Sequence, residues 1–172
     1  MARGQMVLDK DLGWKQIRRS LVEQLGSTEI DVEAFIPGDP TEPGTIAHYA
    51  AINEFGSDKI PERSFIRSTM TARSAAYTAA MDGAIRRAIT TGLDRGDALR
   101  MIEASLQKLG IIVVGDIQNT ISSGIDPANA PSTIAQKGSS KPLIDTGALR
   151  QAITSRVSQR QRGKLRAARK GR

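Results

Sequence analysis

Hydrophobic side chains recur at three- and four-residue steps in three parts of the chain, a spacing that places them on one face of a helix. The pattern predicts a first helix over residues 11–26 and two longer ones, over residues 65–89 and from Asp94 or Asp97 to about Ser122. Because Ser64 can cap the second helix and Thr90-Thr91-Gly92 ends it, we expect the long helices to form an antiparallel hairpin. The expected inward positions are Trp14, Ile17, Leu21 and Leu25 in the first helix; Ile66, Met70, Tyr77, Met81, Ile85 and Ile89 in the second; and Leu99, Ile102, Leu106, Leu109, Val113, Ile117 and Ile121 in the third.

Alternating apolar and polar residues predict two strands, over residues 29–36 and 152–157. Residues 46–55 predict a short helix or strand that ends at Gly56. The run Ile111-Ile112-Val113-Val114 suits a buried strand as well as a helix, and we favour the helix because the helical step continues on both sides of it. The inward positions expected within residues 46–55 are Ile46, Tyr49, Ala50 and Ile52.

Two segments rich in Pro, Gly and Ser interrupt the regular pattern. Residues 37–44 predict an exposed, mobile loop, and residues 124–141 predict a long excursion with one helical turn over residues 132–137. The elements together predict an α+β fold: a small mixed or antiparallel sheet packed against a long helical hairpin, with a long loop and a basic C-terminal extension. We expect one domain over residues 1–157 and a basic, flexible tail over residues 158–172. A small sheet leaves its edges open, and open edges favour pairing between subunits.

Composition narrows the class of protein. The 172 residues contain no Cys, which excludes disulfide frameworks and thiolate metal sites. Aromatic residues are few: one Trp, two Tyr and three Phe. No apolar run is long enough for a membrane span or, near Met1, for a signal peptide. These features predict a protein made and kept in a cytoplasm, with no membrane partner.

Charge is concentrated at the C-terminus. Residues 156–172 hold eight Lys or Arg and no acid, while the rest of the chain carries 17 basic against 18 acidic groups. Such a tail can hold nucleic acid by counterion release, dock on an acidic protein surface, or serve only as a solvated, disordered extension. The cations expected to contact DNA or an acidic partner are Arg160, Arg162, Lys164, Arg166, Arg169, Lys170 and Arg172.

The sequence contains no recognisable catalytic set. His48 is the single histidine, and no Ser or Cys motif accompanies it, so we interpret it as a surface or partly packed side chain. Acids such as Glu29, Asp31 and Glu33 lack the spacing that gathers three metal ligands, and no Gly-rich phosphate loop occurs. We therefore predict no enzymatic activity, no cofactor, no metal and no small-molecule substrate.

Two motifs stand out, some 75 residues apart. The first is Asn53-Glu54-Phe55-Gly56 followed by Ile60-Pro61-Glu62-Arg63-Ser64-Phe65, and the second is Lys141-Pro142-Leu143-Ile144-Asp145-Thr146-Gly147-Ala148-Leu149. In both, Gly or Pro sets a turn and an apolar residue anchors the next element. The order and the residue pattern of the two motifs resemble those of the tail-completion or neck proteins of long-tailed bacteriophages. Residues 129–137 are similar to that family as well. The resemblance covers roughly residues 45–157, with Ser64 where a second Pro is common in the family.

The resemblance implies a structural virion protein rather than an enzyme. It implies a closed homo-oligomeric ring, a hexamer being favoured, at the head–tail junction, where it completes or attaches the tail and leaves a channel for double-stranded DNA. Its neighbours would be the head-connector ring and the tail-terminator or tube ring, with loops 37–44 and 124–141 as candidate contacts. The expected location is the neck or upper tail of the virion, after assembly in the host cytoplasm. The alternative is a basic nucleic-acid-binding protein acting through its tail.

The motif residues have two compatible interpretations. Within one subunit, Phe55 and Phe65 would anchor the core, Pro61 would form a turn, and Arg63 would cap a helix or form a salt bridge. The same residues can also brace a contact between subunits, because a ring subunit presents two different surfaces to identical neighbours. The residues assigned to these roles are Asn53, Glu54, Phe55, Gly56, Pro61, Arg63, Phe65, Pro142, Leu143, Asp145, Thr146, Gly147 and Leu149.

Overall fold

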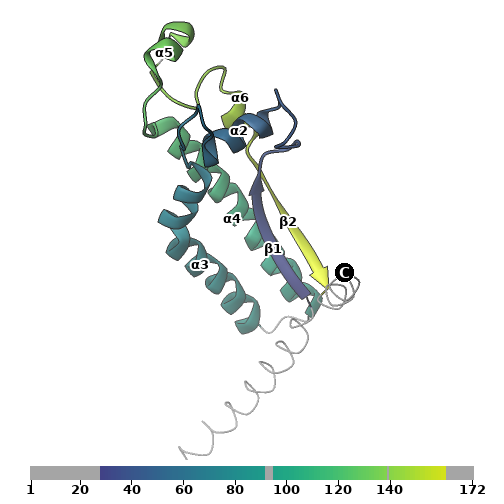
Figure 1. Ribbon diagram of the computed structural model, residues 1–172. Coiled ribbons are helices and arrows are strands. Elements are labelled where there is room, and N and C mark those ends of the chain that lie inside the picture. Colours follow the sequence, from purple (N-terminus) through teal and green to yellow (C-terminus); the bar gives the residue numbers. More distant parts are fainter. Residues whose placement is uncertain (1–27, 92–94, 139, 162–172) are drawn as a thin grey trace, which may run out of the picture. The chain divides into compact units, whose positions relative to one another are not determined.

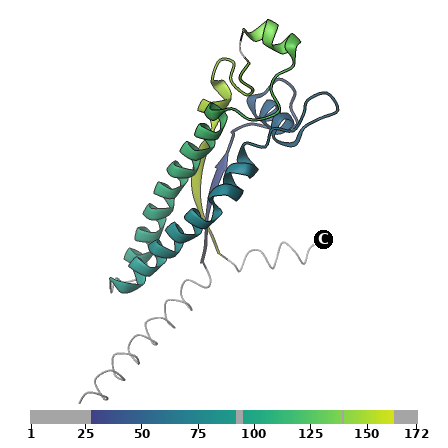
Figure 2. The same cartoon turned by 90° about the vertical axis from the view of Figure 1, so that its left-hand side faces the viewer.

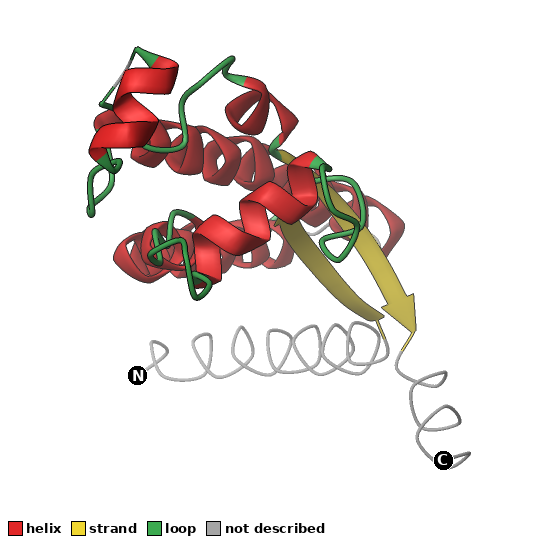
Figure 3. Ribbon diagram, turned by 45° about the horizontal axis from the view of Figure 1, so that its top comes forward, coloured by secondary structure: helices red, strands yellow, loops and turns green. Residues whose placement is uncertain are grey.

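The computed structural model describes residues 28–91, 95–138 and 140–161. In chain order the elements are β1 (Thr28–Phe35), α2 (Ile46–Phe55), α3 (Ile66–Thr90), α4 (Arg95–Ser123), α5 (Pro131–Lys137), α6 (Ala148–Ala152) and β2 (Thr154–Gln161) (Figure 1). The two strands pair as an antiparallel sheet, and helices make up most of the rest (Figure 3). The mixed α+β class is confirmed, whereas the helix predicted over residues 11–26 lies outside the described residues.

The chain divides into two compact units. The larger comprises residues 32–79 and 107–156, and so contains all of α2, α5 and α6. The described part of the smaller comprises residues 28–31, 80–91, 95–106 and 157–161. Both predicted motifs belong to the larger unit.

In the larger unit the first half of α3 runs antiparallel to the second half of α4 (Figure 2). Polar contacts join the two helices: the hydroxyl oxygens of Thr69 and Thr120 lie 2.7 Å apart, and the Tyr77 hydroxyl donates to Asp116 Oδ2 at 2.9 Å. Arg73, which interrupts the apolar pattern of α3, places Nη2 3.8 Å from Asp116 Oδ1. The predicted antiparallel pairing of the long helices is confirmed here.

Tyr77 should ionise at a much higher pH than a free tyrosine. Burial of its ring, followed by the hydrogen bond to Asp116 and that carboxylate's charge, raises its pKa to about 12. Since the pKa is near 10 in an unfolded chain, the stabilising effect is complete below about pH 10 and is lost as the pH rises towards 12. We expect a Tyr49→Phe variant, in which Tyr77 is the remaining tyrosine, to show phenolate absorbance about two pH units higher when native than in urea. Equal midpoints, with circular dichroism showing a folded chain, would contradict the assignment.

The buried face of α4 was predicted well and that of α3 was not. Of the seven predicted positions on α4, six are buried and Leu99 is half-buried. On α3, by contrast, Met70, Met81 and Ile85 are 41%, 37% and 40% exposed, so their inward assignment is wrong. Tyr77 is buried as predicted, and Thr69, Ala84 and Ala88 form the rest of the buried stripe of α3.

Gly110 permits a close approach of α4 to the sheet. A Cβ atom at this position would lie 2.7 Å from the Ser155 Oγ of β2 and 3.3 Å from the Val32 Cγ2 of β1. A glycine inside a helix costs about 1 kcal/mol relative to alanine. Here that cost is offset by helix-to-sheet contact that no larger residue allows.

The second strand is longer than the sequence indicated. Ala152 ends α6, and β2 continues to Gln161, so the first four residues assigned to a flexible tail form part of the sheet. Arg156 is also engaged: its Nη2 lies 2.8 Å from Glu33 Oε2, and its guanidinium stacks over Phe35 at 4.9 Å from the ring centroid. The pattern ended at Val157 because Ser, Gln and Arg have weak strand preferences, whereas pairing with β1 extends the strand.

Candidate functional site

Glu54 is the structural centre of the first motif. Its side chain is only 4% exposed, although it is a carboxylate, and it accepts hydrogen bonds from five donors. Oε2 accepts from the backbone N–H groups of Phe65 at 2.8 Å and Ile66 at 2.9 Å. Oε1 accepts from the Arg67 backbone N–H at 2.9 Å, the Ser64 hydroxyl at 2.9 Å and Arg67 Nε at 3.1 Å. The carboxylate therefore caps the N-terminus of α3 and binds a guanidinium at the same time.

This arrangement corrects the predicted N-cap. The first N–H groups of the helix, those of Phe65, Ile66 and Arg67, donate to Glu54, and Ser64 donates its own hydroxyl proton to the same carboxylate. A carboxylate is the better acceptor, because the free N–H groups and the dipole at a helix N-terminus favour negative charge. The last turn of α2 thus sets where α3 begins.

The two phenylalanines of the motif have different environments. Phe65 is completely buried, as predicted, at the start of α3. Phe55 is 65% exposed, so its assignment as a core anchor is wrong. The Arg67 guanidinium lies over its ring, 4.8 Å from the centroid. One face of the exposed ring is therefore covered by a cation.

Arg63 is a buried cation that binds neutral oxygens. It is 6% exposed, and its Nε and Nη2 donate to the carbonyl oxygens of Pro127 and Ala128 at 2.7 Å and 3.1 Å. Its Nη1 donates to Asn53 Oδ1 at 3.5 Å, and its own N–H donates to the Asn53 carbonyl at 2.7 Å. The predicted cap or salt bridge is therefore wrong: within the described part of the chain, Arg63 ties the loop after α4 to α2 without a carboxylate.

The second motif positions α6 and closes the long excursion. Leu143 and Leu149 are both 4% exposed, Pro142 is buried, and Thr146 Oγ1 accepts from the Ala148 N–H at 3.3 Å. Gly147, with φ +81°, precedes α6, and the side chain of Asp145 is exposed. Asn129 Nδ2 donates to the Lys141 carbonyl at 3.2 Å, which joins the two ends of the excursion around α5.

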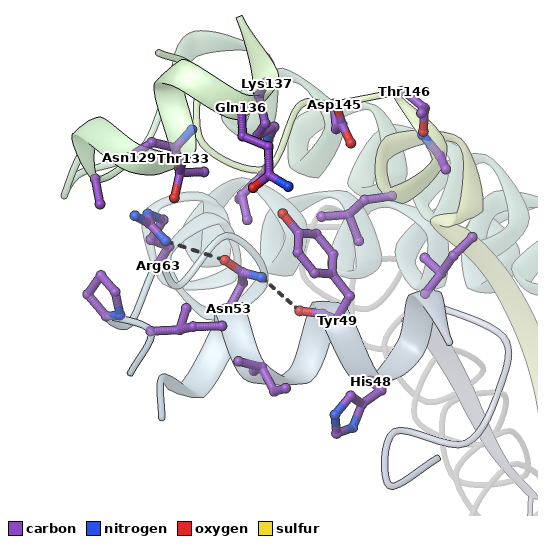
Figure 4. A pocket seen from close by; sticks show the side chains of 18 of the residues that line it. His48, Tyr49, Asn53, Arg63, Asn129, Thr133, Gln136, Lys137, Asp145 and Thr146 are labelled. Atoms are coloured by element: carbon purple, nitrogen blue, oxygen red, sulfur yellow. Dashed lines mark hydrogen bonds between the residues drawn. The ribbon is translucent and has the colours of Figure 1, made fainter. Parts of the chain in front are cut away.

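Both motifs line one open cavity of about 930 Å³ (Figure 4). From the first motif come Asn53, Ile60, Pro61 and Arg63, and from the second Leu143 and residues 145–149. The helices α2 and α5 complete the lining, and Tyr49 of α2 lies between Arg63 and the segment that carries Asp145 and Thr146. Glu54, Phe55, Gly56, Phe65 and Pro142 are absent from the lining of this cavity.

Burial and two charged residues of the cavity lining change the pKa of Tyr49. Burial raises its pKa, the Arg63 charge opposes the rise, and the Asp145 carboxylate adds to it. Tyr49 is nevertheless 41% exposed, and Ile46 is 40% exposed, so their predicted inward positions are wrong. Ala47, Ala50, Asn53 and Glu54 are the residues that α2 buries.

His48 has a structural partner. Its Nδ1 lies 2.7 Å from the Pro40 carbonyl oxygen, which can only accept, so this nitrogen is the donor. The contact fixes the exposed loop 37–44 to α2. Asp39 in that loop accepts from the Thr41 hydroxyl at 2.6 Å and from its N–H at 2.8 Å, and these bonds lower the pKa of the Asp39 carboxyl.

The described residues hold no group of three His, Cys, Asp or Glu side chains placed to bind a metal ion. None of the described helices has the length and apolar character needed to cross a membrane. In the sequence-predicted cation set, Arg160 belongs to β2, and Arg162, Lys164, Arg166, Arg169, Lys170 and Arg172 lie outside the described residues.

Several lining residues escaped the sequence analysis. Tyr49 was assigned to the core, Lys59 was given no role, and Thr133, Gln136 and Lys137 were included only as part of the candidate contact loop 124–141. Their only signal was proximity to the motifs in sequence, or membership of residues 129–137. Arg63 of the first motif binds the carbonyl oxygen of Pro127, in the long excursion that leads to the second motif, and the sequence gives no sign of this contact.

Comparison with protein-family models, with curated proteins and with solved structures found no match to this chain.

Proposed function

We propose that this chain is a structural subunit of a homo-oligomeric ring at the head–tail junction of a long-tailed bacteriophage, with a central channel for DNA. The observation that carries the proposal is the presence of two separate exposed apolar surfaces on the larger unit. A subunit of a cyclic ring needs two such surfaces, because each contact joins different faces of neighbouring copies. The motif resemblance supplies the location.

The first surface surrounds Phe55. Phe55 is 65% exposed and adjoins an apolar cavity of about 220 Å³ that Ile36, Pro40 and Ala51 help to line. An exposed aromatic side chain beside a small apolar cavity is typical of the buried centre of a protein interface. This surface lies at the junction of α2 and the start of α3.

The second surface is on α4. Ile111 and Ile112 are 70% and 54% exposed, although they are among the most apolar residues of the chain. Single exposed apolar residues are common on protein surfaces, but adjacent isoleucines in the middle of a long helix favour a partner. The helical assignment of this run is confirmed, so both side chains project from one stretch of α4.

The chemistry of the motifs supports a non-enzymatic role. Glu54 has five donors around it and serves as a cap, and Arg63 holds a loop. The Ser64 hydroxyl does donate to Glu54, but three backbone N–H groups and Arg67 Nε bind the same carboxylate, and this many donors make it a weak base. The motifs thus build the subunit and position its loops.

Light scattering of the purified chain, alone and with the protein of the adjoining ring, tests the proposal. We expect a defined species several times the mass of one subunit. A strictly monomeric chain under both conditions would contradict it.

The nucleic-acid alternative depends on cations mostly outside the described residues. Because β2 extends to Gln161, the informative deletion removes residues 162–172 and leaves the sheet intact. The alternative requires tight DNA binding that weakens steeply with salt and disappears on deletion. The ring proposal instead expects the oligomer to persist without these residues.

A further inference from the structure

We propose that the cavity formed by the two motifs binds a short peptide segment of a partner protein, one that presents an acidic side chain to Arg63 and an apolar side chain beside it. The proposal concerns the cavity alone and holds whether or not the chain forms a ring. Three features carry it: a buried cation without a counter-charge among the described residues, an excess of positive charge in the lining, and apolar walls.

The cation is Arg63. Buried charged groups in proteins are normally paired with an opposite charge, because removing a charge from water is costly. Arg63 is only 6% exposed, yet its three side-chain partners in the described chain are two carbonyl oxygens and one amide oxygen. A guanidinium has five N–H donors, so two remain available after these three bonds. An incoming carboxylate would supply both the missing charge and the missing acceptors.

The rest of the lining reinforces this preference. Lys59 and Lys137 also line the cavity, while Asp145 is the single carboxylate among its lining residues. Three cations against one anion attract a negatively charged occupant. The excess is local, since the chain outside residues 156–172 is almost neutral.

Apolar side chains form other parts of the wall. Ile52, Ile60, Leu143 and Leu149 line the cavity, and Leu143 adopts φ +63°, a left-handed conformation that is costly for a large residue. Backbone strain of this kind persists where the surrounding structure fixes it, frequently at ligand sites. The walls therefore suit an apolar side chain next to the acidic one.

The geometry favours a peptide over nucleic acid. The volume of about 930 Å³ falls in the usual range for small-ligand and side-chain sites, which is far too small for a duplex. Phosphate backbones are held by exposed cations, whereas Arg63 is buried. A carboxylate on a flexible side chain can enter where a duplex cannot.

Selection from a displayed library of random peptides on the immobilised full-length chain tests the proposal. We expect the selected peptides to share an Asp or Glu adjacent to an apolar residue. Replacing that acid by its amide in a selected peptide should weaken binding about tenfold, measured by fluorescence anisotropy, since a charge-assisted pair would be lost.

Variants of the chain locate the binding site. Lys137→Glu reverses a charge in the lining, and Lys108→Glu makes the same change at an exposed position of α4 outside it. We expect binding to fall in Lys137→Glu and to stay near the wild-type value in Lys108→Glu. Arg63→Met should abolish binding of the acidic peptide, with urea unfolding used to confirm that the variant is folded.

The proposal is overturned if selection yields no acidic preference, or no peptide at all. It is also overturned if Lys137→Glu and Lys108→Glu weaken binding equally, because binding would then reflect the general basic charge of the chain. Inorganic phosphate serves as a competitor: displacement of the peptide by phosphate alone at equal concentration would show a simple anion site rather than a peptide site.

Discussion

Replacing Glu54 by alanine should destabilise the protein by about 2–4 kcal/mol, because a buried N–H donor left without an acceptor costs about 1–3 kcal/mol. The substitution leaves three backbone N–H groups at the start of α3 without their acceptor and removes the anion that faces Arg67. Loss of an ordinary helix cap costs only about 0.5–2 kcal/mol. A larger loss of stability would therefore measure what the buried Glu54 carboxylate contributes beyond capping. Urea unfolding followed by circular dichroism measures the free energy of unfolding.

Glu62→Ala is the matched control for this change. Glu62 Oε1 lies 2.8 Å from Nη2 of the same Arg67, but the Glu62 side chain is 55% exposed. An exposed ion pair of this kind contributes about 0.2–1 kcal/mol. Equal losses in the two variants would show that Glu54 acts as a surface partner of Arg67 and does not organise the α2–α3 junction.

The double variant Ile111→Glu, Ile112→Glu should abolish the oligomer and leave a folded subunit. Both side chains are largely exposed, so charge at these positions changes the stability of a single subunit by only about 0.5 kcal/mol each. In a subunit contact, the same carboxylates would be removed from water without partners, at a cost of several kcal/mol. Light scattering should therefore report the mass of one subunit, while circular dichroism and thermal unfolding remain near wild type.

Asn119→Glu provides the comparison, because residue 119 is an exposed polar position of the same helix. It adds a charge to α4 about two turns beyond Ile112 and leaves both isoleucines in place, and we expect it to assemble normally. An oligomer that withstands the double variant would remove the α4 surface from the proposed contact.

The long helices could be predicted from sequence because their apolar spacing repeats over many turns. α4 shows this best, since its large apolar residues face the core at nearly every predicted position. On α3 the same rule misplaced Met70, Met81 and Ile85, because small residues, Ala84 and Ala88, occupy the buried stripe. Periodicity of large side chains locates a helix, but packing decides which face is buried.

The candidate site could be predicted only in part. The two motifs were visible in the sequence, yet their functions depend on partners far away in the chain. The cap of α3 comes from Glu54 and not from the adjacent Ser64, and Arg63 binds carbonyl groups 64 and 65 positions later. Local patterns contain no information on such pairings, so neither the cap nor the shared cavity could be derived from them.

Cryo-electron microscopy of the intact particle that carries this chain is the most direct test of its proposed place in the virion. We expect a closed ring of identical copies at the head–tail junction, in which Phe55 of one subunit and Ile111 and Ile112 lie in contacts between neighbours around a DNA-sized channel. Purified particles that lack this chain, or that hold it as isolated single copies, would contradict the proposal.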